Sequence, residues 1–123
     1  MVIQPSPGPE VIGPTLAVEE IDSAPHRHLV VRGEIDIKTA PELGESLAAT
    51  SGDLLLVDMT EVSFIDSSGL RVMAMARERF MEEGRTLVIA APEDSAVVRT
   101  MRLAGMANDF EVISRADEFS GAE

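Results

Sequence analysis

The chain lacks residue types on which whole classes of protein depend. Its 123 residues include no cysteine, no tryptophan and no tyrosine, and only 3% are aromatic. Without cysteine, disulfide frameworks, thiolate metal sites and cysteine-based redox sensing are excluded, and a reducing cytoplasm is the expected location. With so few aromatic rings, the stacking platforms that hold single-stranded nucleic acid are missing as well.

Positive charge and long apolar runs are also scarce. Ten basic residues stand against 22 acidic ones, which gives a formal net charge of -12. This charge repels phosphate backbones and anionic lipids, so we expect neither nucleic acid nor a membrane as a direct partner. The apolar runs at 54–57 and 87–91 are far shorter than the roughly 20 residues that span a bilayer, and no signal-peptide pattern is visible. The expected partner is another protein or a small ligand.

Proline separates a tail from a folded region. Four of the seven prolines lie within residues 1–14 together with two glycines, a composition that cannot bury an apolar core. We predict a disordered tail over 1–14, one folded domain over 15–119 and a disordered C-terminus over 120–123.

Strand and helix patterns alternate within the predicted domain. The strand patterns are short apolar or alternating runs at 15–21, 28–32, 54–57, 86–90 and 110–113. The helix patterns have apolar residues at helical spacing and lie at 39–49, 66–83 and 92–105. Thr39 and Glu42 have the spacing of a capping box, and the acidic pair Glu93 and Asp94 favours the first turn of the last helix.

This order of elements predicts the fold class. An initial hairpin followed by alternating strands and helices indicates an α/β domain with a mixed β-sheet, whose later strands are parallel and packed by α-helices. In such sheets, binding sites lie where strands give way to helix N-termini. Two segments compete for that edge, 34–38 and 63–69.

The segment Asp66-Ser67-Ser68-Gly69 places a carboxylate and two hydroxyls at a predicted strand-to-helix turn. The unpaired backbone N–H groups and the helix dipole at such a turn can hold a phosphate. A structural interpretation is favoured by the spacing alone: Asp66 or Ser67 caps the helix, and Gly69 permits close packing in its first turn. Both interpretations hold if one residue of the motif caps the helix and another presents an exposed hydroxyl.

Four segments then occur in a characteristic order. They are Val-Arg-Gly-Glu-Ile-Asp at 31–36, Leu-Val-Asp at 56–58, Val-Ser-Phe-Ile-Asp-Ser-Ser-Gly-Leu at 62–70 and Met-Arg-Leu-Ala-Gly-Met at 101–106. Together they resemble the anti-sigma factor antagonists of the STAS domain family, over about residues 15–119. The resemblance implies that Ser67 accepts phosphate from an anti-sigma factor that is itself a serine kinase, with Ser68 as a minor alternative acceptor. It also implies that Asp36 belongs to the partner surface.

The resemblance further implies a switch. The unphosphorylated protein would bind the anti-sigma factor and release the sigma factor, whereas the phosphorylated protein would be inactive until a serine phosphatase resets it. Phosphoserine adds roughly -1.5 to -2 charges, here beside Asp36 and Asp66, which suits such a switch. Neither a Gly-x-Ser-x-Gly elbow nor a phosphate-binding loop occurs in the sequence, so we predict no enzyme activity and no cofactor.

The predicted helix after Asp66 places Arg71, Met75 and Arg79 on one face. Met75 is either an ordinary exposed apolar residue or an adaptable contact for the partner, with the two arginines fixing its register. The family often has a small residue at the position of Arg71, a departure that bears on partner specificity. The predicted partner surface comprises Asp36, Asp66, Ser67, Ser68, Gly69, Arg71, Met75 and Arg79.

Two other functions stay open at this point. One is a STAS docking subunit of a stress-signalling or lipid-transport complex, in which Ser67 is not phosphorylated. The other is a domain that binds a small anion or a nucleotide at the helix start over 67–69. No metal site is predicted, because His26 and His28 have no third ligand close in sequence.

Overall fold

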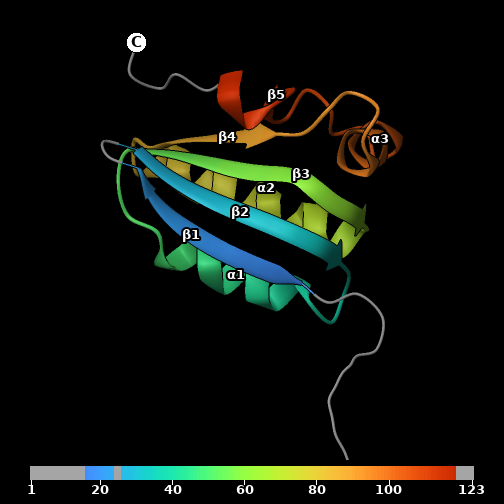
Figure 1. The fold of residues 1–123 in the computed structure, drawn as a ribbon, viewed down its shortest axis with the longest axis horizontal. Coiled ribbons are helices and arrows are strands. Elements are labelled where there is room, and N and C mark those ends of the chain that lie inside the picture. Colours follow the sequence, from blue (N-terminus) through green and yellow to red (C-terminus); the bar gives the residue numbers. More distant parts are fainter. Residues whose placement is uncertain (1–15, 24–25, 119–123) are drawn as a thin grey trace, which may run out of the picture.

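The computed structural model describes residues 16–23 and 26–118, and the predicted tail over 1–14 and the C-terminus over 120–123 lie outside these ranges. Its strands are β1 (Ala17–Ser23), β2 (His26–Ile35), β3 (Leu54–Ile65), β4 (Thr86–Ala90) and β5 (Glu111–Ile113) (Figure 1). Its helices are α1 (Ala40–Ala49), α2 (Ser67–Glu82) and α3 (Ala96–Leu103), followed by the 3-10 turn η2 (Ala116–Glu118).

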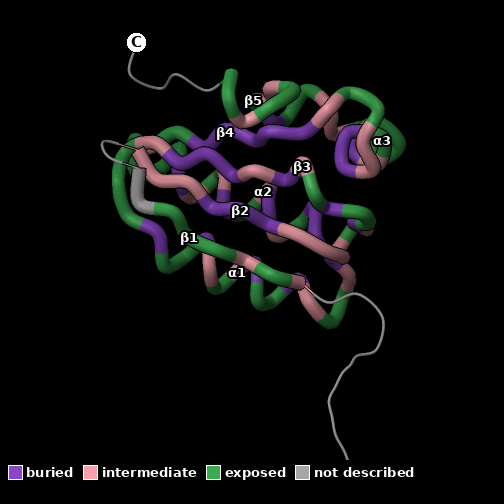
Figure 2. The backbone as a smooth tube through the Cα atoms, viewed as in Figure 1, coloured by how far each residue is buried: buried purple, intermediate pink, exposed green. Residues whose placement is uncertain are grey.

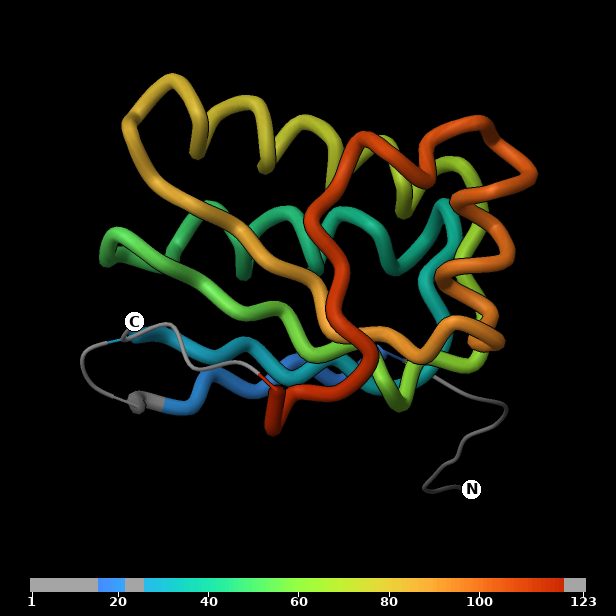
Figure 3. The backbone as a smooth tube through the Cα atoms, turned by 90° about the horizontal axis from the view of Figure 1, so that it is seen from above, coloured from blue at the N-terminus to red at the C-terminus, as the bar shows by residue number. Residues whose placement is uncertain are grey.

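The strands form one five-stranded sheet in sequence order. β1 pairs with β2 in antiparallel fashion, and each later pair, from β2–β3 to β4–β5, is parallel. α1 and α2 therefore serve as crossovers between parallel strands, and they lie side by side against one face of the sheet, while α3 packs near the end of β3 (Figures 1 and 3). The predicted α/β class, the hairpin and the mixed sheet are confirmed.

The core lies between the helices and one face of the sheet. Its apolar side chains come from alternate strand positions and from the inner faces of the helices, among them Leu29, Val31, Ile35, Leu55, Val57, Leu70, Met73, Phe80 and Ile89. Leu56 points to the other face, where it forms a small cluster with Val88 and Ala90 against Ile113 and Ala116. The run at 54–57 is thus covered on both sides, as its continuous hydrophobicity predicts, and Figure 2 shows this centre of the sheet as buried.

β3 is much longer than the predicted strand at 54–57. Its register against β2 shifts twice, between the partners of Val30 and Arg32 and between those of Gly33 and Glu34. Such bulges break the alternation of apolar and polar residues, which explains why the sequence pattern ended early. The extension brings Ile65 opposite Ile35, so β2 and β3 end side by side.

Two predicted helix starts are wrong in detail. The Thr39 side chain does not cap α1; its hydroxyl accepts from the Asp36 N–H at 2.9 Å and donates to the Glu34 carbonyl at 2.9 Å. α3 starts at Ala96 rather than at Pro92, because the Ser95 hydroxyl accepts from the Val98 N–H at 3.2 Å. The acidic pair of residues 93 and 94 therefore precedes the helix and does not form its first turn.

The turns at the N-terminal ends of β3 and β4 are held together by Arg85. Its Nε donates to the Gly52 carbonyl at 2.7 Å and its Nη2 to the Thr50 carbonyl at 3.1 Å. The guanidinium also lies 3.8 Å from the centre of the Phe80 ring and pairs with Glu83 at 2.8 Å. We call this group of contacts the Arg85 clamp; it lies at the end of the sheet opposite to Ser67.

Candidate functional site

The two segments that compete for the site lie next to each other. The N–H of Asp66 donates to the Ile35 carbonyl at 3.1 Å, which joins the start of α2 to the end of β2. The turn over 36–39 follows directly from that strand end. Both segments therefore contribute to one edge of the molecule, at the C-terminal ends of β2 and β3 (Figure 1).

Asp66 is the N-cap of α2. Its Oδ1 accepts from the Ser68 N–H at 2.9 Å, from the Gly69 N–H at 3.4 Å and from the Ser68 hydroxyl. Its carbonyl oxygen accepts from the Leu70 N–H at 3.1 Å. The capping interpretation of the motif thus holds for Asp66, and a carboxylate already occupies two of the donors that a bound anion would need.

The two serines of the motif differ in their surroundings. Ser67 is the first residue of α2; it is exposed, and its hydroxyl forms no hydrogen bond with any described residue. Ser68 is half-buried and its hydroxyl donates to Asp66. A macromolecule that approaches this edge therefore meets the hydroxyl of Ser67, while that of Ser68 is engaged inside the turn.

Gly69 is buried where α2 meets the strand ends. A Cβ at this position would lie 2.6 Å from Cγ2 of Ile35 and 2.8 Å from Cγ1 of Ile65. Only a residue without a side chain allows α2 to start so close to β2 and β3. Gly69 therefore positions Ser67 and offers no surface of its own to a partner.

Asp36 fixes the turn before α1. Its Oδ1 accepts from the Lys38 N–H at 2.9 Å, from the Thr39 N–H at 3.0 Å and from the Thr39 hydroxyl at 3.2 Å. The bond from the Thr39 N–H is the main cause that lowers the pKa of Asp36 below its ordinary value, and the Lys38 N–H acts in the same direction. Asp36 thus places a fixed negative charge beside the start of α2.

The outer face of α2 is only partly as predicted. Arg71 is exposed, and the Met75 side chain is 61% exposed, so both are available to a partner. Arg79 is half-buried, and its Nη2 atom is fully buried without a hydrogen-bond partner in the described part of the chain. The structure thus exposes Arg71 and Met75 at the surface and leaves Arg79 partly buried.

Two apolar side chains at this edge were missed by the sequence analysis. Ile37, in the turn after β2, is 76% exposed, and Phe64, opposite Glu34 near the end of β3, is 45% exposed. Isolated exposed apolar residues are common, but two of them at the same edge as Ser67 enlarge the surface that a protein partner would cover. The sequence held no distinct signal for Ile37, because the alternation of Ile35 and Ile37 with charged residues continues a strand pattern.

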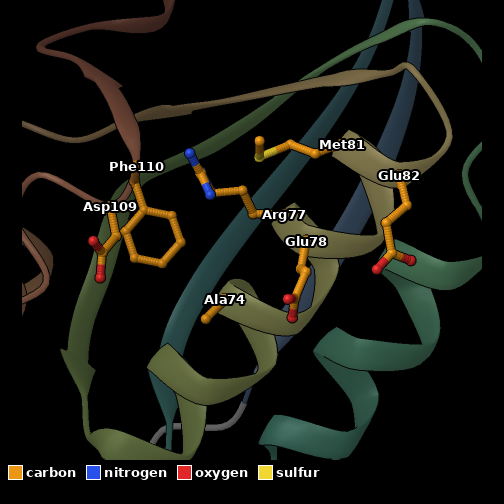
Figure 4. Close-up of a pocket in the computed structure, with 7 residues that line it drawn as sticks. All are labelled: Ala74, Arg77, Glu78, Met81, Glu82, Asp109 and Phe110. Carbon is orange, nitrogen blue, oxygen red and sulfur yellow. The ribbon is translucent and has the colours of Figure 1, made fainter.

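The rest of the described chain carries no comparable arrangement. A groove between α2 and the segment before β5 is lined by Ala74, Arg77, Glu78, Met81, Glu82, Asp109 and Phe110 (Figure 4). His26 and His28 lie at the start of β2, far along the strand from its end at Ile35. Within the ranges 16–23 and 26–118, no three His, Asp or Glu side chains gather as metal ligands, and no helix is long and apolar enough to cross a membrane.

Comparison with known families decides the assignment. A family model described as "Mlab, STAS domain" matches residues 19–114. The chain belongs to the STAS domain family. The matched range covers every strand from β2 to β5 and the three helices, so the resemblance drawn from four sequence segments is confirmed for the family.

Individual STAS relatives carry consistent names. The anti-sigma-B factor antagonist of Listeria monocytogenes is 31% identical over 110 residues, which cover 87% of this chain and 95% of the relative. The anti-sigma-F factor antagonist RsfB of Mycobacterium tuberculosis is 30% identical over 89 residues, which cover 70% of this chain and 71% of that relative. The crystal structure of an anti-sigma factor antagonist from Mycobacterium paratuberculosis superposes with a TM-score of 0.76 at 27% identity, over 85% of this chain and 90% of that one.

Proposed function

We propose that this STAS domain is an anti-sigma factor antagonist whose partner binding is switched by phosphorylation of Ser67. The names of its relatives support the general role. The observation that carries the choice of residue is the contrast between the exposed, unbonded hydroxyl of Ser67 and the hydroxyl of Ser68, which donates to Asp66.

The partner in this proposal is an anti-sigma factor with serine kinase activity. The unphosphorylated domain binds it and thereby releases the sigma factor. In the kinase reaction, Oγ of Ser67 forms a bond to the γ-phosphorus of ATP, the bond to ADP breaks, and the hydroxyl proton passes to a base of the kinase. This chain contributes only the acceptor hydroxyl, and a serine phosphatase later hydrolyses the phosphoserine.

The site's electrostatics explain how the phosphate acts. A phosphate on Ser67 brings roughly -1.5 to -2 charges next to the carboxylates of Asp36 and Asp66. Both carboxylates are held by backbone N–H groups, so neither can turn away without breaking its turn. The added charge therefore stays on the surface. It repels an acidic partner face and must be desolvated to pack against an apolar one, and the backbone need not refold.

The surface that meets the partner combines apolar and charged groups. Ile37, Phe64 and Met75 supply exposed apolar area, and Arg71 supplies positive charge on the first two turns of α2. This mixture of flexible apolar contacts with an arginine is typical of protein interfaces that form and dissociate.

Phosphosite mapping tests the proposal. The full chain and the variants Ser67→Ala and Ser68→Ala are incubated with ATP and lysate of the native cells, and intact mass and modified positions are determined. We expect phosphate on the wild type and on Ser68→Ala, and none on Ser67→Ala. Phosphate on Ser67→Ala would refute the choice of Ser67.

No phosphate on any form, with lysates of both stressed and unstressed cells, would favour a docking subunit that works unmodified. The alternative of a small-anion site is disfavoured, because Asp66 occupies the N–H groups of Ser68 and Gly69.

A further inference from the structure

Arg71 is the basic residue whose position in α2 brings it near Ser67. It follows Ser67 by four residues in α2, so the two side chains lie on one face of the helix, about one turn apart. Side chains of an α-helix tilt toward its N-terminus, which directs the guanidinium of Arg71 back over the turn that begins with Ser67. Arg71 is exposed and forms no ion pair or side-chain hydrogen bond with any described residue.

The helix N-terminus itself is a poor place for a phosphate on Ser67. The N–H groups of Ser68 and Gly69 already donate to the carboxylate of Asp66. The charged groups of the two turns at this edge include the carboxylates of Asp36 and Asp66 and the ammonium of Lys38, and Arg71 lies on α2 one turn after Ser67. Arg71 is the one basic residue within the first two turns of α2.

We propose that Arg71 binds the phosphate of phosphorylated Ser67 within the same chain. This inference rests on the proposed phosphorylation of Ser67 and adds how the phosphate is held. The planar guanidinium donates two parallel N–H groups to phosphate oxygens, a geometry that an ammonium cannot provide. Phosphorylation then changes the partner surface twice: it adds negative charge at Ser67, and it takes up the positive charge that Arg71 otherwise offers to a partner.

The test places phosphoserine at position 67 of the full chain during translation, so that no kinase is needed. The second ionisation of the phosphate is followed by phosphorus NMR across pH in the otherwise wild-type chain and in Arg71→Gln, Arg71→Lys and Arg77→Gln. Arg77 is the matched control, because it lies on the same helix but lines the groove toward Asp109 and Phe110 (Figure 4). Positions 67, 71 and 77 are all at least partly exposed, so the phosphoserine chain and its variants are expected to fold.

We expect the phosphoserine pKa to be about 0.3 to 1 unit lower in the wild-type background than in Arg71→Gln, since a paired cation favours the dianion. Arg71→Lys should retain only part of this shift, and Arg77→Gln should match the wild type. Equal phosphoserine pKa values in the wild-type background and Arg71→Gln would overturn the inference. An equal change of the phosphoserine pKa in Arg77→Gln would also overturn the inference, because such a change would reflect the net charge of the chain and not a pairing with Arg71.

The proposed phosphorylation of Ser67 and the proposed pairing with Arg71 can be refuted independently of each other. If native lysate leaves Ser67 unmodified but the encoded phosphoserine shows the Arg71-dependent shift, the pairing stands and the proposed function falls. If Ser67 is phosphorylated in lysate but the shift is absent, the proposed function stands and the pairing with Arg71 falls.

Discussion

The two ends of the parallel strands are built in opposite ways. At their N-terminal ends, the Arg85 clamp donates to two turn carbonyls and covers the Phe80 ring, so the polar groups of the turns are satisfied inside the molecule. At their C-terminal ends, the carboxylates of Asp36 and Asp66 hold the backbone of the turns. There the hydroxyl of Ser67 and the side chains of Ile37 and Phe64 remain exposed.

In the proposed function, this difference separates the part of the protein that provides stability from the part that recognises a partner. The clamp end ties loops together through the hydrogen bonds of Arg85 and its contact with Phe80. The site end fixes its backbone just as firmly but keeps its side chains available, which is the preorganisation that a reversible docking surface requires. Variants at the two ends should therefore affect different measurements.

The largest expected effect on stability comes from Gly69→Ala. The new methyl group would overlap the stiff β-branched side chains of Ile35 and Ile65, and we expect a loss of about 2 to 3 kcal/mol in the free energy of unfolding in urea. Gly44→Ala is the matched control: its Cβ would lie at an ordinary 3.5 Å from Val72, and the change should stabilise α1 by about 0.5 to 1 kcal/mol. Equal effects of the two variants would contradict the close packing at Gly69.

Arg85→Ala is the corresponding change at the clamp end. It removes two charge-assisted hydrogen bonds and the contact with Phe80, and we expect a loss of about 1 to 2 kcal/mol in the free energy of unfolding. Arg102→Ala, which breaks only an exposed pair with Glu93, should change it by less than about 0.5 kcal/mol. Phosphorylation of Ser67 in lysate should be unaffected by Arg85→Ala; a large loss would show that the two ends are coupled.

Asp66→Ala tests what keeps the serines different. Removing the N-cap should destabilise the protein by about 1 kcal/mol and release the hydroxyl of Ser68. We therefore expect the ratio of phosphate on Ser68 to phosphate on Ser67 to rise, as measured by phosphosite mapping. An unchanged ratio would mean that the kinase alone selects Ser67.

The smallest effect on the free energy of unfolding is expected from Asp36→Asn, and it should appear only at acidic pH. Because the pKa of Asp36 is lowered in the folded protein, its charge contributes stability above the unfolded-state pKa, and this contribution is lost as pH falls through the folded-state pKa. The free energy of unfolding should thus decline less steeply between about pH 5 and pH 3 in Asp36→Asn than in the wild type. Parallel pH profiles would show that the turn bonds do not depend on the charge.

The same two ends show what sequence alone can predict. The sequence located the start of α2 because the Asp66 cap is a local contact with the N–H of Ser68. It did not find the full length of β3, because bulges shift the register of that strand. Thr39 has a capping-box pattern, yet the Asp36 carboxylate takes the Thr39 N–H and the Thr39 hydroxyl reaches Glu34 instead.

Contacts between distant residues and the folded shape of the turns account for the remaining differences. The role of Arg85 depends on carbonyls more than 30 residues away in sequence, which no local pattern encodes. The contrast between Ser67 and Ser68 depends on where two neighbouring side chains point, and Ile37 becomes visible as a surface residue only when the turn is folded.

The central claim is that a phosphate on Ser67 switches partner binding. The most direct measurement uses the kinase purified from native lysate by its activity toward Ser67. Its affinity is determined for the unmodified chain and for the chain with phosphoserine encoded at position 67. The account predicts that phosphoserine weakens binding by at least about tenfold, which corresponds to about 1.4 kcal/mol, while the far-UV circular dichroism stays the same. Equal affinities for the two forms would contradict it.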